Sequence, residues 1–166
     1  MANIVQKQDN RSAFIDTLCE LAEKDERVVF IVADVGFHYA DKFQEKFPDR
    51  YFNFGVTEQS IVIVAAAMAL DGWKPYVYSM VNFVAFRPFE MVRNAVAMHH
   101  APVTLLGVKG SAAYKFYGFS HNMIFDDEDI YHLSKYIYCA KPQTNEEVRN
   151  EILKIYASGK PAYVRL

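Results

Sequence analysis

The sequence predicts an α/β fold: a single doubly wound domain with a mostly parallel sheet of about six strands and helices on both faces. Continuous apolar runs at residues 28–35 and 103–108 are typical of parallel strands buried on both sides. These runs alternate with segments of helical periodicity, which is the pattern of successive strand-helix-strand units. The 166 residues, 52% of them hydrophobic, supply one core and little more.

The first third of the chain alternates between helical and strand patterns. Phe14, Leu18 and Leu21 recur at helical spacing, and a polar segment then closes this helix. Pro48 ends a second helical segment, and Gly55 follows a short aromatic run. The predicted elements are therefore a helix of about three turns before residue 25, a strand at 28–35, a short helix at 39–47 and a strand at 50–54.

A nearly all-apolar helix at residues 58–70 is predicted to be central to the fold, with Thr57 as its N-cap and Asp71-Gly72 as its terminal turn. A long segment at 109–125 has no clear periodicity but is rich in aromatic residues, which indicates a functional loop. The remaining predicted elements are strands at 74–80, 103–108, 136–140 and 162–166 and helices at 88–98, 126–134 and 145–158.

Composition excludes several classes of protein. With 18 basic and 20 acidic residues, the chain has no general attraction to nucleic acid or to anionic membranes. The N-terminus lacks the apolar core of a signal peptide, and no apolar run is long enough to span a bilayer. Cys19 and Cys139 lie far apart, which predicts no disulfide. We expect a cytoplasmic domain over residues 1–166, complete at its C-terminus, with 1–10 as an N-terminal extension.

Ligands of open parallel sheets bind beyond the carboxyl ends of the strands. Four segments should meet there, at residues 34–38, 55–59, 80–87 and 109–121. The chain has no phosphate-binding glycine loop, no metal-binding spacing of His or Cys and no nucleophile elbow. These absences argue against a kinase, a Rossmann dehydrogenase, a metal held by this chain alone and a serine hydrolase.

One run of spaced motifs covers almost the whole chain. The segment FNFGVTEQSIVIVAAAMALDGWKPYVYSMVNFVAFRPFEMVRN follows VADV and precedes GFSHN, EDI and the terminal PAYVRL. In this order, the motifs resemble the pyrimidine-binding domain of transketolase-like thiamine diphosphate enzymes. In that family the cofactor lies between two subunits or domains, of which one holds the diphosphate through magnesium and the other holds the aminopyrimidine.

The resemblance assigns the cofactor contacts. Glu58 matches the glutamate that hydrogen-bonds N1′ of the pyrimidine and promotes loss of the thiazolium C2 proton; alternatively, it only complements the helix dipole. Phe83 is the best match for the ring that stacks on the pyrimidine, with Phe86 nearby and Met80 where many members carry another aromatic; core packing is the alternative for each phenylalanine. Gln59 is a polar neighbour of the cofactor, catalytic or only structural.

Other matches concern the substrate. His121 matches a histidine that faces the reacting carbons and moves or stabilises protons, and Asp34 matches an aspartate near the cofactor and subunit boundary. As alternatives, His121 is an ordinary loop histidine and Asp34 a strand-end cap. Lys109, His38 and Arg165 fall where transketolases place groups for a substrate phosphate, although Arg165 could equally be a surface or interface charge.

Two features depart from the family pattern or invite another interpretation. Tyr117 stands before Gly118 where many transketolases carry an aspartate that accepts a sugar hydroxyl, so we expect it in the substrate site, with a donor ketose that is unusual or absent. The acidic cluster at 126–129 suggests a magnesium site, but adjacent carboxylates at a predicted helix start usually complement the helix dipole.

The Gly-Asp-Gly motif and downstream Asn that bind magnesium in the family are absent from this chain. The resemblance therefore implies a separate diphosphate-binding subunit that supplies the magnesium ligands, self-association through the pyrimidine domain and a heterotetramer. The expected activity is transfer of a two-carbon ketol unit between sugar-like substrates. The alternatives are a β-type subunit of a 2-oxo acid decarboxylase or dehydrogenase and a non-catalytic assembly module.

Overall fold

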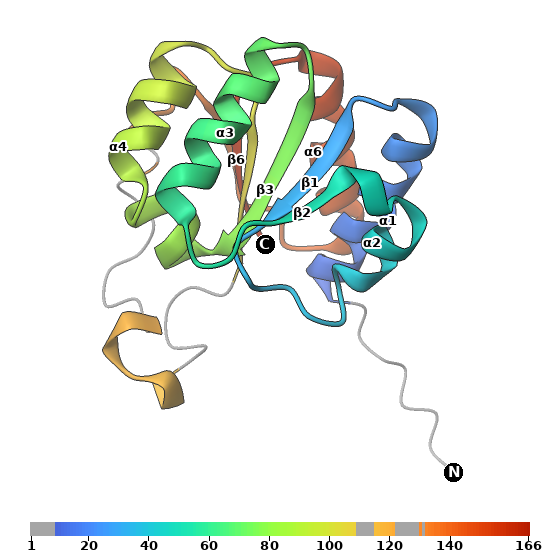
Figure 1. The fold of residues 1–166 in the computed structure, drawn as a ribbon, viewed down its shortest axis with the longest axis horizontal. Helices are drawn as coiled ribbons and strands as arrows, with labels where there is room; N and C mark the ends of the chain where they lie inside the picture. Colours follow the sequence, from blue (N-terminus) through green and yellow to red (C-terminus); the bar gives the residue numbers. More distant parts are fainter. Residues whose placement is uncertain (1–8, 109–114, 122–129, 131) are drawn as a thin grey trace.

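The computed structural model describes residues 9–108, 115–121, 130 and 132–166, and its centre is one six-stranded sheet (Figure 1). Every pairing between neighbouring strands is parallel. The predicted single α/β sheet is confirmed. In spatial order the strands are β2 (Tyr51–Asn53), β1 (Val28–Val32), β3 (Lys74–Met80), β4 (Thr104–Val108), β6 (Ala162–Arg165) and β5 (Tyr138–Ala140).

The strand order reverses between β1 and β3. From β1 the chain moves outward to β2, then returns to place β3 on the other side of β1. In the register, Val32 of β1 lies opposite Asn53 of β2 and Tyr78 of β3. At such a switch point the loops after adjacent strands diverge and leave room for a ligand.

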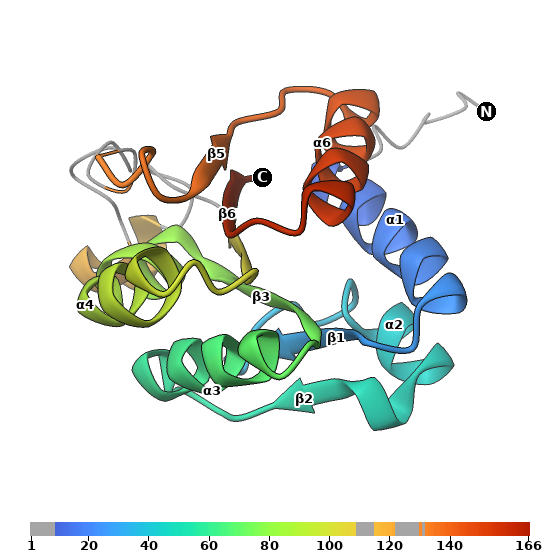
Figure 2. The same ribbon diagram turned by 90° about the horizontal axis from the view of Figure 1, so that it is seen from above.

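Helices cover both faces of the sheet, as Figure 2 shows in a view along it. One face carries α1 (Asn10–Lys24), α2 (Asp41–Lys46) and α6 (Asn145–Ser158). The other face carries α3 (Glu58–Leu70) and α4 (Phe89–Met91), which continues as a π-helix through Val92–Met98. Two separate core clusters fill the spaces between these helices and the sheet.

Local sequence explains where the longer helices begin and how their core faces pack. The side chain of Asp9 accepts a hydrogen bond from the backbone of Arg11 at the start of α1, and Thr144 accepts one from Glu147 at the start of α6. Phe14 of α1 packs edge-on against Phe30 of β1, with ring centroids 5.8 Å apart. The ring contact packs α1 against the middle of β1.

Several predicted boundaries were wrong. The first strand ends at Val32, before the predicted residue 35, because the backbone turns through positive φ at Asp34. Thr57 occupies the N-cap of α3, but its hydroxyl donates to the carbonyl of Phe54 and does not cap the helix. The other differences are a π-helix at Asn82–Phe86, a π-helical end to the 88–98 helix, a shorter α2, β2 and β5, and an α1 that begins at Asn10.

Three predictions fall largely outside the described residues: the acidic cluster at 126–129, most of the helix at 126–134 and part of the loop at 109–125. Within that loop, the described segment 115–121 forms two short 3-10 turns. Among the described residues, no helix is both long enough and apolar enough to cross a bilayer.

Candidate active site

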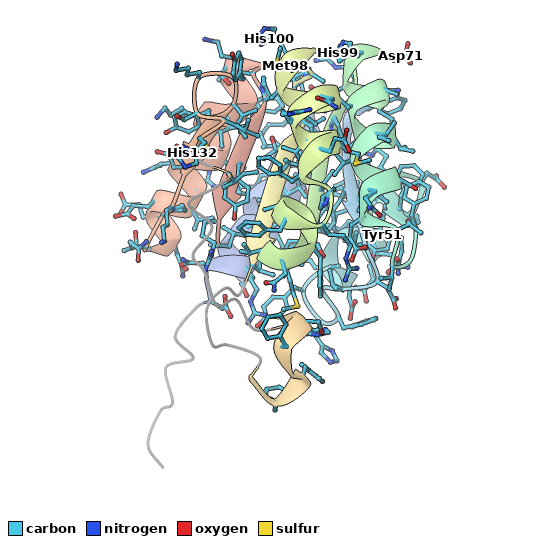
Figure 3. All side chains as sticks on the ribbon, turned by 90° about the vertical axis from the view of Figure 1, so that its left-hand side faces the viewer. Tyr51, Asp71, Met98, His99, His100 and His132 are labelled. Carbon is cyan, nitrogen blue, oxygen red and sulfur yellow. The ribbon has the colours of Figure 1, made fainter. Side chains whose placement is uncertain are left out.

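The predicted site segments gather at one edge of the sheet. The strands are parallel, so β1, β2, β3 and β4 all end at this edge. Segment 115–121, drawn in orange in Figure 1, lies beyond these ends. The opposite edge carries Met98, His99, His100 and Asp71, as Figure 3 shows. The histidine pair is therefore remote from the candidate site.

Glu58 is a buried acid at the start of α3. Its side chain is 3% exposed, and both carboxylate oxygens lie 2.8 Å from Nη1 of Arg87. An ionised carboxylate is costly to bury unless a cation and hydrogen bonds compensate it. Arg87 supplies that compensation while remaining 37% exposed itself. The acid is thus held inside the protein by a partner that reaches it from the surface.

Phe83 joins this ion pair to the rest of the site. The guanidinium carbon of Arg87 lies 4.2 Å from the centre of the Phe83 ring, a cation–π contact. The ring is only 8% exposed, yet it belongs to neither of the core clusters formed by the described residues. Phe86 instead packs against the core cluster beneath α3. The two phenylalanines, which the resemblance placed together near the pyrimidine, therefore have different surroundings.

His121 lies against the other side of this group. Its ring meets the Phe83 ring edge-on at 5.1 Å and lies 5.3 Å from the ring of Tyr117. Nδ1 of His121 is 2.9 Å from the hydroxyl of Ser120, whose carbonyl accepts a hydrogen bond from the Asn82 side chain at 3.1 Å. The hydroxyl can pair with Nδ1 in either tautomer of the ring, as donor or as acceptor. An imidazole donates and accepts protons, so His121 is a candidate proton-transfer group.

A cavity of about 270 Å³ opens beside His121, over the ends of β1, β3 and β4. Its walls combine aromatic rings with charged groups, a combination suited to a small polar ligand. The guanidinium of Arg11 reaches it from α1, pairing with Asp9 and lying 4.0 Å above the ring of Tyr39. The lining residues are Arg11, Asp34, Val35, Gly36, Phe37, Tyr39, Tyr78, Met80, Val108, Tyr117 and His121.

The loop after β1 shapes this cavity through unusual backbone geometry. Asp34, Gly36 and His38 all have positive φ, at 51°, 90° and 71°. Glycine suits the middle position because a side chain there would meet the Tyr78 ring at 3.1 Å and be strained. The side-chain oxygen of Asn53 accepts a hydrogen bond from the Asp34 backbone at 3.0 Å. Such strain persists where the surroundings over-determine it and is common at functional sites.

The structure groups most predicted site residues but not all of them. Glu58, Phe83 and His121 form one connected set through Arg87, while Met80, Asp34 and Tyr117 line the adjoining cavity with His121. The other predicted residues are placed apart or not described: Gln59 and His38 are exposed and do not line the cavity, Arg165 ends β6 beside Gly107, and Lys109 lies outside the described residues.

Three residues of this region were missed in the sequence. Arg87 and Arg11 carry no local signal, since Arg87 pairs with an acid 29 positions earlier and Arg11 appears only as the second residue of a helix. Asn53 lies within a predicted strand, and the sequence does not signal its contact with Asp34 because the two residues are 19 positions apart. The RPFEM segment could have directed attention to Arg87, because it follows the predicted aromatic pair directly.

The chemistry of the site favours a flat ligand with a nitrogen that shares a proton. Glu58 offers a carboxylate that shares the Arg87 guanidinium with the ring of Phe83, and His121 offers a second proton-transfer group at 5.1 Å from that ring. Within the residues that the structure describes, no group of three His, Cys, Asp or Glu side chains gathers as metal ligands.

Known proteins resemble this sequence over most of its length. The family model "Transketolase, pyrimidine binding domain" matches residues 6–166. A "Putative transketolase C-terminal section" from Methanocaldococcus jannaschii is 31% identical over 157 residues, which cover 94% of this chain and 49% of that protein. A "1-deoxy-D-xylulose-5-phosphate synthase" from Desulfitobacterium hafniense (strain Y51) is 35% identical over 138 residues, or 80% of this chain and 21% of the synthase.

Among solved structures, a chain titled "Split gene transketolase, inactive beta4 tetramer" superposes with a TM-score of 0.79 at 26% identity. The superposition covers 95% of this chain and 50% of the other. This chain therefore spans about half or less of the proteins that it matches here.

Proposed function

This chain belongs to the transketolase pyrimidine-binding domain family, and from that premise we propose that it is one subunit of a divided transketolase-like enzyme. In this proposal the chain holds the aminopyrimidine of thiamine diphosphate and takes part in moving a two-carbon ketol unit between sugar-like substrates. One observation carries the proposal: the buried carboxylate of Glu58 lies in a connected set with Phe83 and His121 at the carboxyl edge of the sheet.

The residues of this set fit the ring they would bind. The ring of Phe83 provides an aromatic face in the site, and Glu58 provides a carboxylate with little access to water. When bound, thiamine diphosphate supplies a carbon nucleophile from its thiazolium ring. Glu58 holds a proton at N1′ of the pyrimidine, and Phe83 orients the ring plane so that this hydrogen bond forms. Exclusion of water from Glu58 strengthens that bond.

His121 acts on the substrate side. Its imidazole lies between Phe83 and the 270 Å³ cavity, so a substrate carbonyl in the cavity would lie near Nε2. Ser120 fixes the other ring nitrogen, which keeps His121 oriented while it donates or accepts a proton at the substrate oxygen. Arg11 and Asp34 offer a cation and an anion to polar substrate groups, and Tyr117 offers a phenol where many transketolases carry a carboxylate.

A second polypeptide would complete the enzyme. The matched part makes up 21% of the synthase and 49% of the Methanocaldococcus jannaschii relative, and the latter is itself described as a C-terminal section. The structure titled a split-gene transketolase supports the same division. We therefore assign the diphosphate contacts and the magnesium ligands to a partner chain, in a heterotetramer of two copies of each.

Self-association would use the outer face of α3. Ile63, Val64 and Leu70 project from this helix into solvent, with exposed fractions of 50%, 37% and 60%. A stripe of large apolar side chains on an otherwise well-packed domain is typical of an interface. Phe54 and Val56, exposed just before the helix, extend the same apolar surface toward Glu58. A second copy bound here would cover the approach to the acid.

The test is reconstitution with a partner that contains Gly-Asp-Gly and a downstream Asn, sought first in the neighbouring reading frame. Glu58→Gln keeps the shape of the side chain but cannot donate and accept a proton in turn. We expect kcat for ketose conversion to fall by about three orders of magnitude. Glu45→Gln, at an exposed glutamate of α2, is the matched control. Full turnover by the Glu58→Gln complex would contradict the proposal.

The names of the relatives favour one further candidate reaction, the synthesis of 1-deoxy-D-xylulose 5-phosphate. Several are named 1-deoxy-D-xylulose-5-phosphate synthase, with up to 35% identity to this chain. The cavity offers a phenol at Tyr117 where a donor sugar would meet a carboxylate, which favours a donor with fewer hydroxyl groups. Turnover with a 2-oxo acid donor and none with ketoses would select this alternative.

A further inference from the structure

Arg87 closes the site that the proposed function requires. Its Nη1 lies 2.8 Å from both oxygens of Glu58, and with the guanidinium in place only 3% of the Glu58 side chain is exposed. A ring nitrogen therefore has almost no free surface through which to contact the acid. Some part of this pair must move before a ligand can bind to Glu58.

The same guanidinium also lies over the aromatic partner. Its carbon lies 4.2 Å from the centre of the Phe83 ring, a stacking distance for a flat, nitrogen-rich cation. One side chain thus takes both features that a flat heteroaromatic ring would use, the carboxylate for a hydrogen bond and the ring face for stacking. Both contacts are made by the same guanidinium, and together they indicate an occupied subsite.

The structure also indicates which group moves. Glu58 is fixed in the first turn of the 13-residue helix α3, and Phe83 is buried within the π-helix Asn82–Phe86. Arg87 is the exposed member, and among the described residues its side chain is held by Glu58 and Phe83. Its long side chain can swing into solvent by changing its rotamers, whereas the other two would need the backbone to rearrange.

We infer that Arg87 is an internal occupant of the aminopyrimidine subsite, which the cofactor ring displaces when it binds. The inference rests on the proposed function and adds a positioning residue to it. While the site is empty, Arg87 compensates the buried charge of Glu58; during binding, the ring must replace both contacts. A ligand that stacks but cannot hydrogen-bond leaves Glu58 buried and unpaired, which penalises it. Arg87 thereby makes binding selective for rings with a suitable nitrogen.

Binding of thiamine to the full chain tests the inference without any turnover. Thiamine carries the aminopyrimidine and lacks the diphosphate, so it probes this subsite by calorimetry. We expect Arg87→Ala to bind thiamine about tenfold more tightly than wild type, because no occupant has to be displaced. Arg93→Ala, at an exposed arginine of the same helical stretch, should match wild type. Equal or weaker binding by Arg87→Ala, or no binding by any variant, would overturn the inference.

Two further measurements guard against a variant that fails to fold. Arg87→Lys keeps a charge for Glu58 but offers no planar group to cover Phe83, so we expect thiamine affinity to rise several-fold. In wild type with ¹⁵N-labelled arginine, the Arg87 side-chain N–H signals should lose protection from exchange as thiamine is added. Unchanged protection at saturation would contradict displacement.

Failure of the inference can be distinguished from failure of the proposed function. If Glu58→Gln abolishes turnover in the reconstituted complex while Arg87→Ala does not tighten binding, Glu58 is catalytic and Arg87 is a fixed partner. If Glu58→Gln leaves turnover unchanged, the proposed function itself fails.

Discussion

Two buried carboxylates lie at opposite edges of the same sheet, and their surroundings differ. Asp25 caps the C-terminus of α1 just before β1 begins, so it lies at the amino edge. Glu58 opens α3 at the carboxyl edge. Their side chains are similarly hidden, with 8% and 3% exposure. Burial alone therefore does not distinguish a structural acid from a candidate catalytic one.

The number and mobility of the partners distinguish them. Asp25 accepts hydrogen bonds from Arg27 at 2.9 Å and Tyr156 at 2.9 Å, and Lys74 lies 3.1 Å away. These groups come from the turn before β1, from α6 and from β3, so Asp25 ties the end of α1 to α6 and β3. Hydrogen bonds from Arg27, joined by those from Lys74 and Tyr156, outweigh desolvation and hold the pKa of Asp25 well below its usual range.

Glu58 has a single side-chain partner among the described residues, and that partner is partly exposed. Arg87 reaches it from the surface and ties α3 only to the turn after β3. An acid that is satisfied by one displaceable cation can exchange it for a ligand, whereas Asp25 would have to give up three partners together. The comparison suggests that a replaceable partner, more than burial, marks a site for binding.

The largest expected effect is on Asp25. Asp25→Ala leaves Arg27 and Lys74 without their shared acid and removes a link between α1, β3 and α6. We expect the free energy of unfolding to fall by about 4 kcal/mol in urea titrations. Asp71→Ala is a matched control, because Asp71 also caps a helix C-terminus but is exposed. Equal losses of unfolding free energy in Asp25→Ala and Asp71→Ala would contradict a special structural role for Asp25.

Arg87→Ala should have the next largest effect. It leaves the buried Glu58 charge uncompensated, so we expect a loss of about 2 kcal/mol in the free energy of unfolding. Adding Glu58→Gln removes that charge, so the double variant should be more stable than Arg87→Ala alone. Additive losses in this cycle, measured by urea unfolding, would mean that the pair does not interact as described.

The strands and helices of the fold were predictable from the sequence, but the partners of the two buried acids, Asp25 and Glu58, were not. Apolar runs and helical periodicity identify strands such as β3 and β4, because these patterns are local. Partners of Asp25 lie as far away as Tyr156, 131 positions later, and Arg87 follows Glu58 by 29 positions. No local pattern encodes such contacts. The position of Glu58 came from motif resemblance, whereas its burial and its partner came from the packing of α3 against the turn after β3.

The π-helix at Asn82–Phe86 escaped prediction for a related reason. Its residues are apolar enough for a strand or an α-helix, and nothing in them signals bonds across five residues. The wider turn still matters to the site, since it carries Phe83 and directly precedes Arg87.

The stability that Asp25 contributes should depend on pH. The folded pKa of Asp25 lies below its unfolded value, so its contribution to stability is complete above about pH 4 and is lost as pH falls toward the folded pKa. We expect wild type to lose stability more steeply than Asp25→Asn below about pH 4. Parallel curves from pH titrations of urea unfolding would contradict this assignment, and Asp71→Asn serves as the control.

The smallest effect should come from removing one partner of Asp25 at a time. Tyr156→Phe deletes the hydroxyl that donates to Asp25 but keeps the ring that lies 3.7 Å from the Lys74 ammonium. Because Arg27 and Lys74 remain, we expect a loss of less than about 1 kcal/mol in thermal or urea unfolding. A loss as large as that of Arg87→Ala would show that Asp25 also depends on a single partner. A small loss would support the view that Asp25 is structural because it has several partners. Glu58 has one partner among the described residues and can therefore exchange it for a ligand.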